Sequence, residues 1–527
     1  MEVVERKGSV TKSKGVSMDE ALALAGFGPC NVVLILVSGT VLASFLLEIL
    51  GVSYIIPVIG QDLDVTTKEK GVLSAVGFAG VIVSSHLWGF LADTHGRRKI
   101  IIPALLISFV ISVISSFTAN FWVIVFLRFM VGFFVSGPSS ATYAYLGEFH
   151  NRKNASRAIM GASVVFGTGG ILLPGLAYIV INQGWQLPIP LLGIIYRPWR
   201  LYFIVCSLPG LISAMILLRF PESPKFTFSQ GNTRQAIEAI QWVHRFNACC
   251  RSKTPLHIES IEEDEEDRLE REKRAVLRNT KGCLALMKLV WNQTAPLFMS
   301  PHLRKTAIVC ILQFGTYLAA HGMFMFFPEI VNQLVLVRET GVGAATMCQI
   351  LEQYGNFSAV EEVGEGSQMM APAAFQLSFI LELIYAVGFA VIGVTINAVG
   401  RLPLLVFIFE TCGVAGLLLF VVKVPTAVIW LYIVFLCSGY TAVMVNAIIV
   451  DLYPTSLRAM AVCIALMVGR LGSVVGSNML GILLEEYCEL TFGIASVLLI
   501  ICGVLAFFIP NISQRVLSKT PSDGDDS

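Results

Sequence analysis

The chain has 527 residues, of which 55% are hydrophobic and only 14% are charged, and its formal net charge is +1. A typical soluble protein has about 25% charged residues, so a soluble enzyme, a secreted disulfide scaffold and a nucleic-acid-binding protein are all disfavoured. The charged residues cluster between apolar stretches of about 20 residues, the length that crosses a bilayer core of roughly 30 Å. The composition therefore indicates a protein that crosses a lipid bilayer many times. The 12 cysteines form no CxxC pattern, and we expect no metal and no cofactor.

We predict twelve membrane-spanning helices in two sets of six. Their approximate ranges are 31–57, 71–91, 100–119, 121–144, 158–181, 201–219, 306–327, 373–396, 402–422, 426–450, 459–483 and 490–510. The expected fold class is an all-α membrane protein with two pseudo-symmetric bundles of six helices, 31–220 and 306–510. A polar linker, 221–305, joins the bundles, and shorter polar segments, 1–30 and 511–527, flank them.

The distribution of Lys and Arg predicts the orientation of the chain. Basic residues are concentrated in the segments on one side of the predicted spans, including the short loops at 97–99 and 152–157. Cytoplasmic loops carry such an excess of positive charge. We therefore expect the linker and both termini to be cytoplasmic. The first apolar run begins near Asn31 and continues to Pro57, which is too long for a cleavable signal peptide.

The two halves carry a weak internal repeat, as expected if the bundles arose by duplication. Gly96 and Arg97 follow span 2, and Gly400 and Arg401 follow span 8. An acid at the end of a span and an arginine shortly after it also recur: Glu148 with Arg157, and Asp451 with Arg458.

Several motifs identify a family. The segment 89–99 (GFLADTHGRRK) resembles the signature between spans 2 and 3 of the major facilitator superfamily, and 221–226 (PESPKF) resembles a motif of its sugar-porter and organic-ion branches. The segments 145–149 (YLGEF), 241–244 (QWVH) and 327–329 (FPE) resemble the synaptic vesicle glycoprotein 2 family. That family has a large folded insertion between spans 7 and 8, whereas this chain has only 328–372 there.

This resemblance implies a monomeric transporter that moves a small polar or charged organic solute by alternating access between two bundles. It implies a plasma membrane or a secretory or synaptic vesicle membrane. We find no GxxxxGK[ST] motif for ATP and no nucleophile–base pair, so neither a primary pump nor an enzyme is expected. The alternative from another class is a vesicle glycoprotein that acts as a scaffold or receptor without net flux.

The resemblance also implies a latch at the cytoplasmic ends of the helices, where charged residues pair between helices in the outward-open state. The residues expected to form it are Gly89, Asp93, Gly96, Arg97, Arg98, Glu148, Arg157, Arg401, Asp451 and Arg458. Positive charge that only orients the chain in the membrane is the alternative for the basic residues, but it does not explain Asp93 or Glu148.

Polar residues within the predicted spans are candidates for a substrate cavity, because an intramembrane charge costs roughly 2.5–3.5 kcal/mol and needs a reason. Arg470 lies in the middle of span 11, where the organic ion transporters carry a functional base, and would attract an anionic or zwitterionic solute. The other candidates are Gln313, Tyr317 and His321, spaced four apart on one face of span 7, together with Glu382, Glu410 and Asn446. Packing between helices is the alternative for each.

Glu48 in span 1 and Arg128 in span 4 lie at similar depths, so we expect them to pair. The segment 128–132 (RFMVG) resembles the RxxxG element of proton-coupled members, in which a span 1 acid partners the arginine. The vesicle glycoprotein pattern has two acids in span 1, and Phe45 occupies the position of the second. Proton coupling and uniport therefore both remain open.

Two features are predicted for the side opposite the linker. The sequon at Asn356 is the only one of four on that side, and we expect it to be glycosylated. Cys348 and Cys488 are the only cysteines that we place outside the membrane on the same side. A disulfide between them would connect the loop between spans 7 and 8 to the loop between spans 11 and 12.

Overall fold

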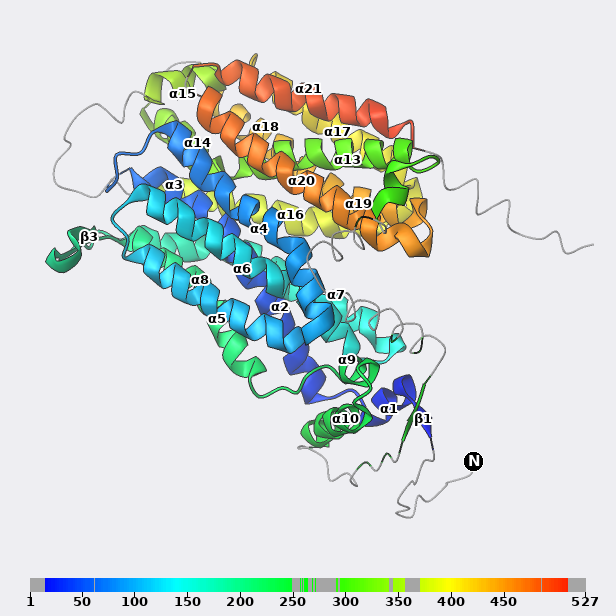
Figure 1. Cartoon of the computed structure of the whole chain (residues 1–527). Helices are drawn as coiled ribbons and strands as arrows, with labels where there is room; N and C mark the ends of the chain where they lie inside the picture. The colour runs from blue at the N-terminus through cyan, green and yellow to red at the C-terminus, as the bar shows by residue number, and fades with distance from the viewer. Residues whose placement is uncertain are drawn as a thin grey trace, which may run out of the picture.

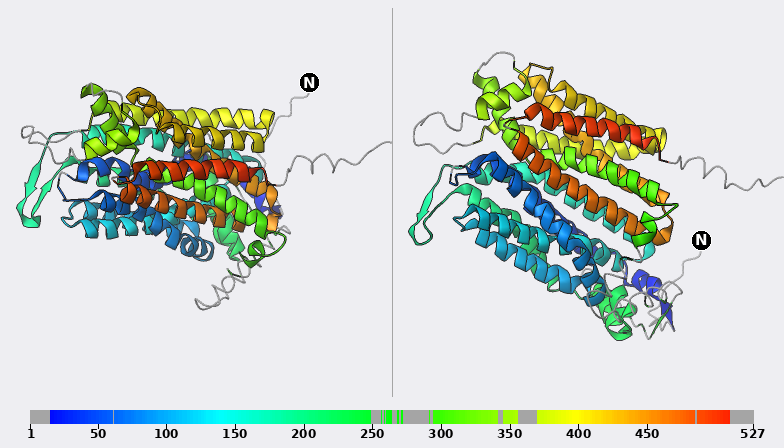
Figure 2. Two further views of the ribbon diagram at one scale, coloured as in Figure 1. Left: turned by 90° about the horizontal axis from the view of Figure 1, so that it is seen from above. Right: turned by 45° about the horizontal axis from the view of Figure 1, so that its top comes forward.

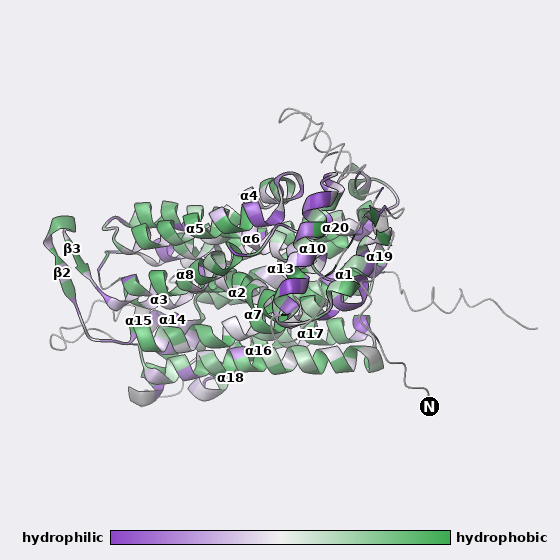
Figure 3. Ribbon diagram, turned by 90° about the horizontal axis from the view of Figure 1, so that it is seen from below, coloured by the Kyte–Doolittle hydropathy of each residue, from purple (hydrophilic) through white to green (hydrophobic). Residues whose placement is uncertain are grey.

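The computed structural model describes residues 15–60, 62–248, 294–340, 345–355, 370–484 and 486–509, with isolated positions between 256 and 291. In these residues, 11 helices are long and apolar enough to cross a membrane, and a bent pair makes a twelfth span. The twelve spans predicted from hydropathy are thus confirmed. Figure 3 shows that the long helices are mostly hydrophobic, whereas hydrophilic residues gather on segments such as α10.

Six spans form the N-terminal bundle. They are α2 (Pro29–Leu50) continued by α3 (Val52–Ile59), α4 (Thr67–His95), α5 (Arg97–Ser116), α6 (Phe121–Glu148), α7 (Arg152–Ile181) and α8 (Pro198–Leu217). A hairpin of β2 (Leu187–Ile189) and β3 (Ile194–Tyr196) connects α7 to α8. The linker contributes α9 (Pro224–Ser229) and α10 (Thr233–Ala248), and the N-terminal segment contributes α1 (Met18–Ala25). Strand β1 (Val16–Ser17) of the N-terminal segment pairs in parallel with β4 (Ile261–Glu262) of the linker.

The other six spans form the C-terminal bundle. They are α13 (Leu303–Tyr317) with α14 (Phe327–Thr340), then α16 (Pro372–Val399), α17 (Arg401–Leu418), α18 (Pro425–Leu436) with α19 (Tyr440–Leu452), α20 (Thr455–Leu483) and α21 (Cys488–Ala506). A short helix, α15 (Met347–Gly355), lies between α14 and α16.

We name the two ends of the molecule by their contents. The linker side carries α1, α9, α10 and the C-terminal end of α21, and the disulfide side carries α15 and the N-terminal end of α21. The bundles contact each other through α4 with α20, α7 with α16, and α3 with α14. The two bundles converge at the disulfide side and diverge toward the linker side (Figure 1), and the tilted view in Figure 2 shows the same arrangement.

Contacts on the disulfide side hold the bundles together. Lys70 at the start of α4 forms an ion pair with Glu329 at the start of α14. Helices α4 and α20 approach so closely that a Cβ atom on Gly71 would lie 2.9 Å from the Cα of Gly481. The rings of Tyr54 and Phe375 stack across the interface with their centroids 6.2 Å apart. The conformation is therefore closed on the disulfide side.

Span 7 differs from its predicted range, 306–327. It begins at Leu303, and the segment Leu303–Gly322 is bent by 49° relative to Phe327–Arg338. A turn of π-helix at Leu318–Gly322 precedes the break. Here the chain packs against α20 so closely that a Cβ on Gly322 would lie 2.8 Å from the Cα of Gly476. Such an insertion loosens a helix and often marks a functional site, and hydropathy alone does not report it.

The loops after α4 and α16 show the internal repeat in backbone geometry. Gly96 separates α4 from α5 with φ +110°, and Gly400 separates α16 from α17 with φ +94°. Side chains disfavour this backbone region, so both turns require glycine. The equivalent glycines in the two halves therefore serve the same role.

A buried polar cluster attaches the linker helix α10 to the N-terminal bundle. The side chain of Asn247 accepts a hydrogen bond from the Cys30 amide (2.9 Å) and donates to Asn31 (3.1 Å). Asn31 in turn contacts Nε2 of His150 at 3.0 Å. Burial and the nearby Lys225 lower the pKa of His150 below its usual value, so the ring is neutral at pH 7 and accepts this bond.

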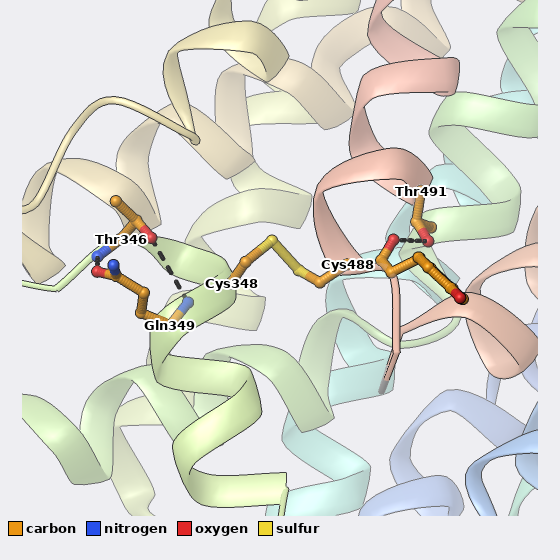
Figure 4. Close-up of a disulfide and its surroundings, with 6 residues drawn as sticks. Thr346, Cys348, Gln349, Cys488 and Thr491 are labelled. Atoms are coloured by element: carbon orange, nitrogen blue, oxygen red, sulfur yellow. Dashed lines mark hydrogen bonds between the residues drawn. A yellow bond between two sulfur atoms is a disulfide. The ribbon is translucent and has the colours of Figure 1, made fainter.

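Cys348 of α15 and Cys488 of α21 are joined by a disulfide, with their Cα atoms 5.6 Å apart (Figure 4). Thr346 supports this end of α15 because its hydroxyl accepts a hydrogen bond from the Gln349 amide. Asn356, the predicted glycosylation site, and the C-terminal segment 511–527 lie outside the described residues.

The bridge leads to a prediction about stability. The double variant Cys348→Ser/Cys488→Ser should lose roughly 2–4 kcal/mol of stability, because the bridge closes a long loop in the unfolded chain. Thermal unfolding of detergent-purified protein measures this loss, and Cys463→Ser, which removes an exposed free thiol, should unfold like the wild type. A reductant should lower the unfolding temperature of the wild type only; an equal effect on the double variant would contradict the prediction.

Candidate functional site

Arg470 lies in the middle of α20, at the interface between the two bundles. Its Nη1 donates a hydrogen bond of 2.8 Å to Oγ of Ser85, which belongs to α4 of the other bundle. It forms no ion pair with any carboxylate that the structure describes. The apolar span begins at Met460, and the ten residues from there to Arg470 correspond to about 15 Å of helix, which places the residue near the centre of a core of roughly 30 Å.

The polar stripe predicted on span 7 divides into two parts. The rings of Tyr317 and His321 stack with centroids 4.5 Å apart, and both residues are partly exposed. Gln313 is fully buried and donates to the side chain of Asn446 in α19 at 3.1 Å. Tyr317 and His321 can therefore line a solute path, whereas Gln313 and Asn446 connect two helices within one bundle.

Glu382 of α16 faces the other bundle. Its Oε2 would lie 2.7 Å from a Cβ atom placed on Gly170 of α7, so the absence of a side chain at Gly170 makes room for the carboxylate. Glu382 and Arg470 are thus an acidic and a basic side chain at the interface between the bundles, and they do not pair with each other.

Glu410, which the sequence suggested for the cavity, lies away from this interface in the structure. It lies in α17 against α21, where its Oε1 would be 2.2 Å from a Cβ atom on Gly503. Helices α17 and α21 pack closely against one another on the side of the C-terminal bundle that faces away from the N-terminal bundle (Figure 1). The sequence showed that Glu410 lies within the membrane but not which side of the helix faces the other bundle.

Glu48 and Arg128 form a buried ion pair, and each side chain is at most 3% exposed. Nη1 of Arg128 donates to Oε2 of Glu48 at 3.0 Å. Ser112 of α5 connects them, because its hydroxyl donates to Glu48 (2.8 Å) and accepts from Nη2 of Arg128 (2.8 Å). The guanidinium also lies 4.2 Å from the ring centroid of Phe203.

Glu48, Ser112 and Arg128 form a hydrogen-bonded triad inside the N-terminal bundle. Removing one partner of a buried pair typically costs about 3–5 kcal/mol because it strands a charge. Protonation of Glu48 would weaken the pair in the same way, without any change in sequence. The polar link among α2, α5 and α6 at this point would then be weaker.

The expected latch appears as two separate networks. Nη2 of Arg97 bridges Asp93 (2.9 Å) and Glu148 (3.0 Å) within the N-terminal bundle. Arg401 pairs with Asp451 within the C-terminal bundle. In the described part of the chain no ion pair joins the two bundles on the linker side. Ion pairing on the linker side thus does not close the molecule in this conformation.

Other residues expected in the latch have different partners. Arg98 donates to the carbonyl oxygens of Leu217 and Leu218 at the end of α8, and its amide donates to Glu222. Gly96 provides the turn described above, and a Cβ atom on Gly89 would meet nothing within 4 Å. Arg157 is exposed, and neither it nor Arg458 forms an ion pair with any residue that the structure describes. The expectation that both arginines pair is therefore not met in this conformation.

Sequence reasoning missed three groups that the structure brings together. Ser112 belongs to a row of buried serines, 108, 112 and 116, spaced one helical turn apart, and this spacing was the available signal. Asp62 holds Arg197 (2.7 Å) and Arg200 (3.2 Å) on the disulfide side, and Lys70 pairs with Glu329. Both sets join residues more than 130 positions apart, so a pattern within one segment of the sequence could not reveal them.

Within the described residues, no group of three or more His, Cys, Asp or Glu side chains could hold a metal ion.

Comparison of the sequence with known proteins identifies a family and several relatives. The sequence model of the Major Facilitator Superfamily matches residues 36–351. Synaptic vesicle glycoprotein 2B of Mus musculus is 26% identical over 321 residues, which are 58% of this chain and 46% of the relative. Synaptic vesicle glycoprotein 2A of Bos taurus is 25% identical over 322 residues, 59% of this chain and 43% of the relative. The matched regions thus span less than half the length of these relatives.

Solved structures share the fold. The inward open conformation of the xylose transporter XylE from E. coli has a TM-score of 0.61 at 14% identity and covers 91% of this chain and 96% of its own. A bacterial homolog of the human lysosomal transporter Spinster, inward-facing and unoccupied, has a TM-score of 0.60 at 14% identity and covers 95% of this chain and 100% of its own. Together with the signature at 89–99 and the two six-helix bundles, these matches show that the chain is a member of the major facilitator superfamily, with synaptic vesicle glycoproteins 2A and 2B among its relatives.

Proposed function

We propose that this protein moves a small anionic or zwitterionic organic solute across a membrane by alternating access. The observation that carries the proposal is Arg470, a guanidinium near the bilayer centre whose one hydrogen-bond partner among the described residues is the Ser85 hydroxyl. A charge at this depth is costly and marks a substrate or ion pathway. A bound anion would supply the missing countercharge.

The surroundings of Arg470 fit a solute that bridges the bundles. Ser85 lies on the opposite bundle, and Tyr317 with His321 provides an aromatic wall beside it. Glu382 adds a carboxylate at the same interface, which would bind the ammonium group of a zwitterion. A solute held by both bundles can stabilise their closure, which is the basis of alternating access.

The Glu48–Ser112–Arg128 triad supports proton coupling. Its carboxylate is buried, paired and placed where a proton would change the packing of three helices. A structural relative, the D-xylose-proton symporter, has a TM-score of 0.60 at 14% identity, and its name describes proton coupling in that protein. Uniport is the alternative, because Phe45 stands where the vesicle glycoprotein pattern has a second acid.

We further propose that the linker side is cytoplasmic, in a plasma membrane or a secretory vesicle membrane, as the distribution of Lys and Arg indicates. On this orientation the present conformation is inward-facing. A scaffold or receptor without net flux, the alternative from another class, would not need an arginine at the centre of the bundle interface. The variants below therefore separate the two functions.

Orientation is tested through Asn356. The variant Asn356→Gln should abolish the glycosidase-sensitive shift in gel mobility, because only this sequon lies opposite the linker. The variant Asn154→Gln, which changes a sequon on the linker side, serves as the control and should keep the shift. A shift that persists in Asn356→Gln would contradict the orientation.

Solute binding is tested through Arg470. The variant Arg470→Gln should reduce the uptake of organic anions into proteoliposomes by at least tenfold, and Arg470→Lys should restore part of it, because lysine keeps the charge but not the planar geometry. Glu410→Gln is the matched control, since it neutralises an intramembrane charge away from the interface. Equal transport by Arg470→Gln and the wild type would refute the assignment.

Proton coupling is tested through Glu48. In the wild type, an imposed pH gradient should drive accumulation of the solute. Glu48→Gln should abolish this accumulation while preserving solute-for-solute exchange, because the amide cannot release a proton. Ser112→Ala should weaken the pair but keep a titratable carboxylate and therefore keep the response to the gradient. Wild-type accumulation that does not respond to the pH gradient would favour uniport instead.

A further inference from the structure

A cleft at the linker-side end of α8 has the composition of a lipid headgroup site. Its volume is about 460 Å³, and it lies between the end of α8, α9 and α10. Two arginines line it, Arg219 directly after α8 and Arg245 on α10, and both are exposed. Trp242 of α10 lines it as well. Figure 1 shows α10 beyond the linker-side end of the N-terminal bundle.

Two arginines and two glutamates line this cleft, and within the described residues neither arginine forms an ion pair with either glutamate. Of the two acids that line it, Glu222 accepts from the amides of Arg98 (3.0 Å) and Ser223 (3.1 Å). Glu238 pairs with Arg234, which points into solvent and does not line the cleft. Arg219 and Arg245 pair with no carboxylate that the structure describes. Arg98 already caps the end of α8, so Arg219 is not needed there.

Exposed apolar residues lead along α8 toward the cleft. On α8, Ile212, Met215 and Leu218 are exposed in the turns that lead to Arg219. At the end of that helix, Trp242 packs against Phe220 and Phe246, with ring centroids 5.1 and 5.4 Å away. Aromatic residues beside basic residues at the end of a span are typical of the membrane–water interface. An acyl chain along α8 would therefore place its headgroup in the cleft.

We infer that this cleft binds the headgroup of an anionic phospholipid, with Arg219 and Arg245 holding the phosphate and Trp242 covering the glycerol backbone. Basic pockets beside membrane helices bind such headgroups, and anionic lipids are concentrated in the cytoplasmic leaflet. The site joins the last span of the N-terminal bundle to the linker between bundles. It is separate from the solute path around Arg470, and its test does not depend on transport.

The experiment measures the thermal stabilisation of the purified full chain in detergent by dioctanoyl phosphatidylserine, because a ligand of the native state raises apparent stability. We expect saturable stabilisation, with weaker stabilisation by dioctanoyl phosphatidylcholine. Arg219→Gln and Arg245→Gln should each raise the half-saturating concentration about fivefold, from about 1 kcal/mol per basic residue, and the double variant should raise it further. The double lysine variant should restore most of the affinity.

The matched control is Arg304→Gln/Lys305→Gln. It removes the same two charges at the linker-side start of α13, in the other bundle and away from the cleft. This control should bind phosphatidylserine like the wild type, and an equal loss would show general surface attraction and overturn the site. Stabilisation by glycerophosphoserine at the same concentrations would show a site for free phosphates and also overturn the proposal. An unchanged response of the double glutamine variant to phosphatidylserine would also overturn the proposal. The unfolding temperature of this variant without lipid verifies that it is folded.

Discussion

The scarcity of water in the bilayer core is the constraint on which the rest of this structure depends. Backbone groups must be satisfied locally, which permits helices and excludes open sheets. Charged side chains must have partners or a ligand. Glu48 and Arg128 meet this condition within one bundle, as an ion pair that Ser112 bridges. Among the described residues, Arg470 bonds the Ser85 hydroxyl but neither it nor Glu382 forms an ion pair, and both lie where the bundles meet. In the function that we propose, the paired charges form the coupling element and the charges without an ion pair form the solute-binding site.

The two ends of the molecule have opposite roles in this conformation. On the disulfide side, Lys70 with Glu329, the close approach of α4 to α20, and the ring pair Tyr54 and Phe375 hold the bundles together. On the linker side, Arg97 and Arg401 bind acids of their own bundles. Closure of the linker side would require these networks to exchange partners between bundles. A superfamily member that alternates access needs both arrangements to be close in free energy.

The linker region is attached to the N-terminal bundle by specific contacts. Asn247 of α10 bonds the start of α2, and His150 connects the end of α6 to the same cluster. Glu222 of the PESPKF segment holds the turn between α4 and α5. These contacts connect the helix ends beside Arg97 to α10 and to the cleft at Arg219. Lipid bound in this cleft would therefore stabilise the region that must rearrange when the linker side closes.

The sequence by itself determined the fold class, the twelve spans and the family, because hydropathy, charge distribution and turn motifs are local properties of the chain. It also predicted the pair of Glu48 and Arg128, since depth along two helices can be counted in residues, and it singled out Cys348 and Cys488 by their side of the membrane. The tertiary structure decided which face of each helix points inward. It placed Glu410 against α21 and Glu382 against α7, although both are lone acids in apolar helices. It also brought Lys70 to Glu329 and Asp62 to Arg197 and Arg200. These contacts depend on how helices distant in sequence rotate and pack against one another, and periodicity within one helix carries no information about its neighbour.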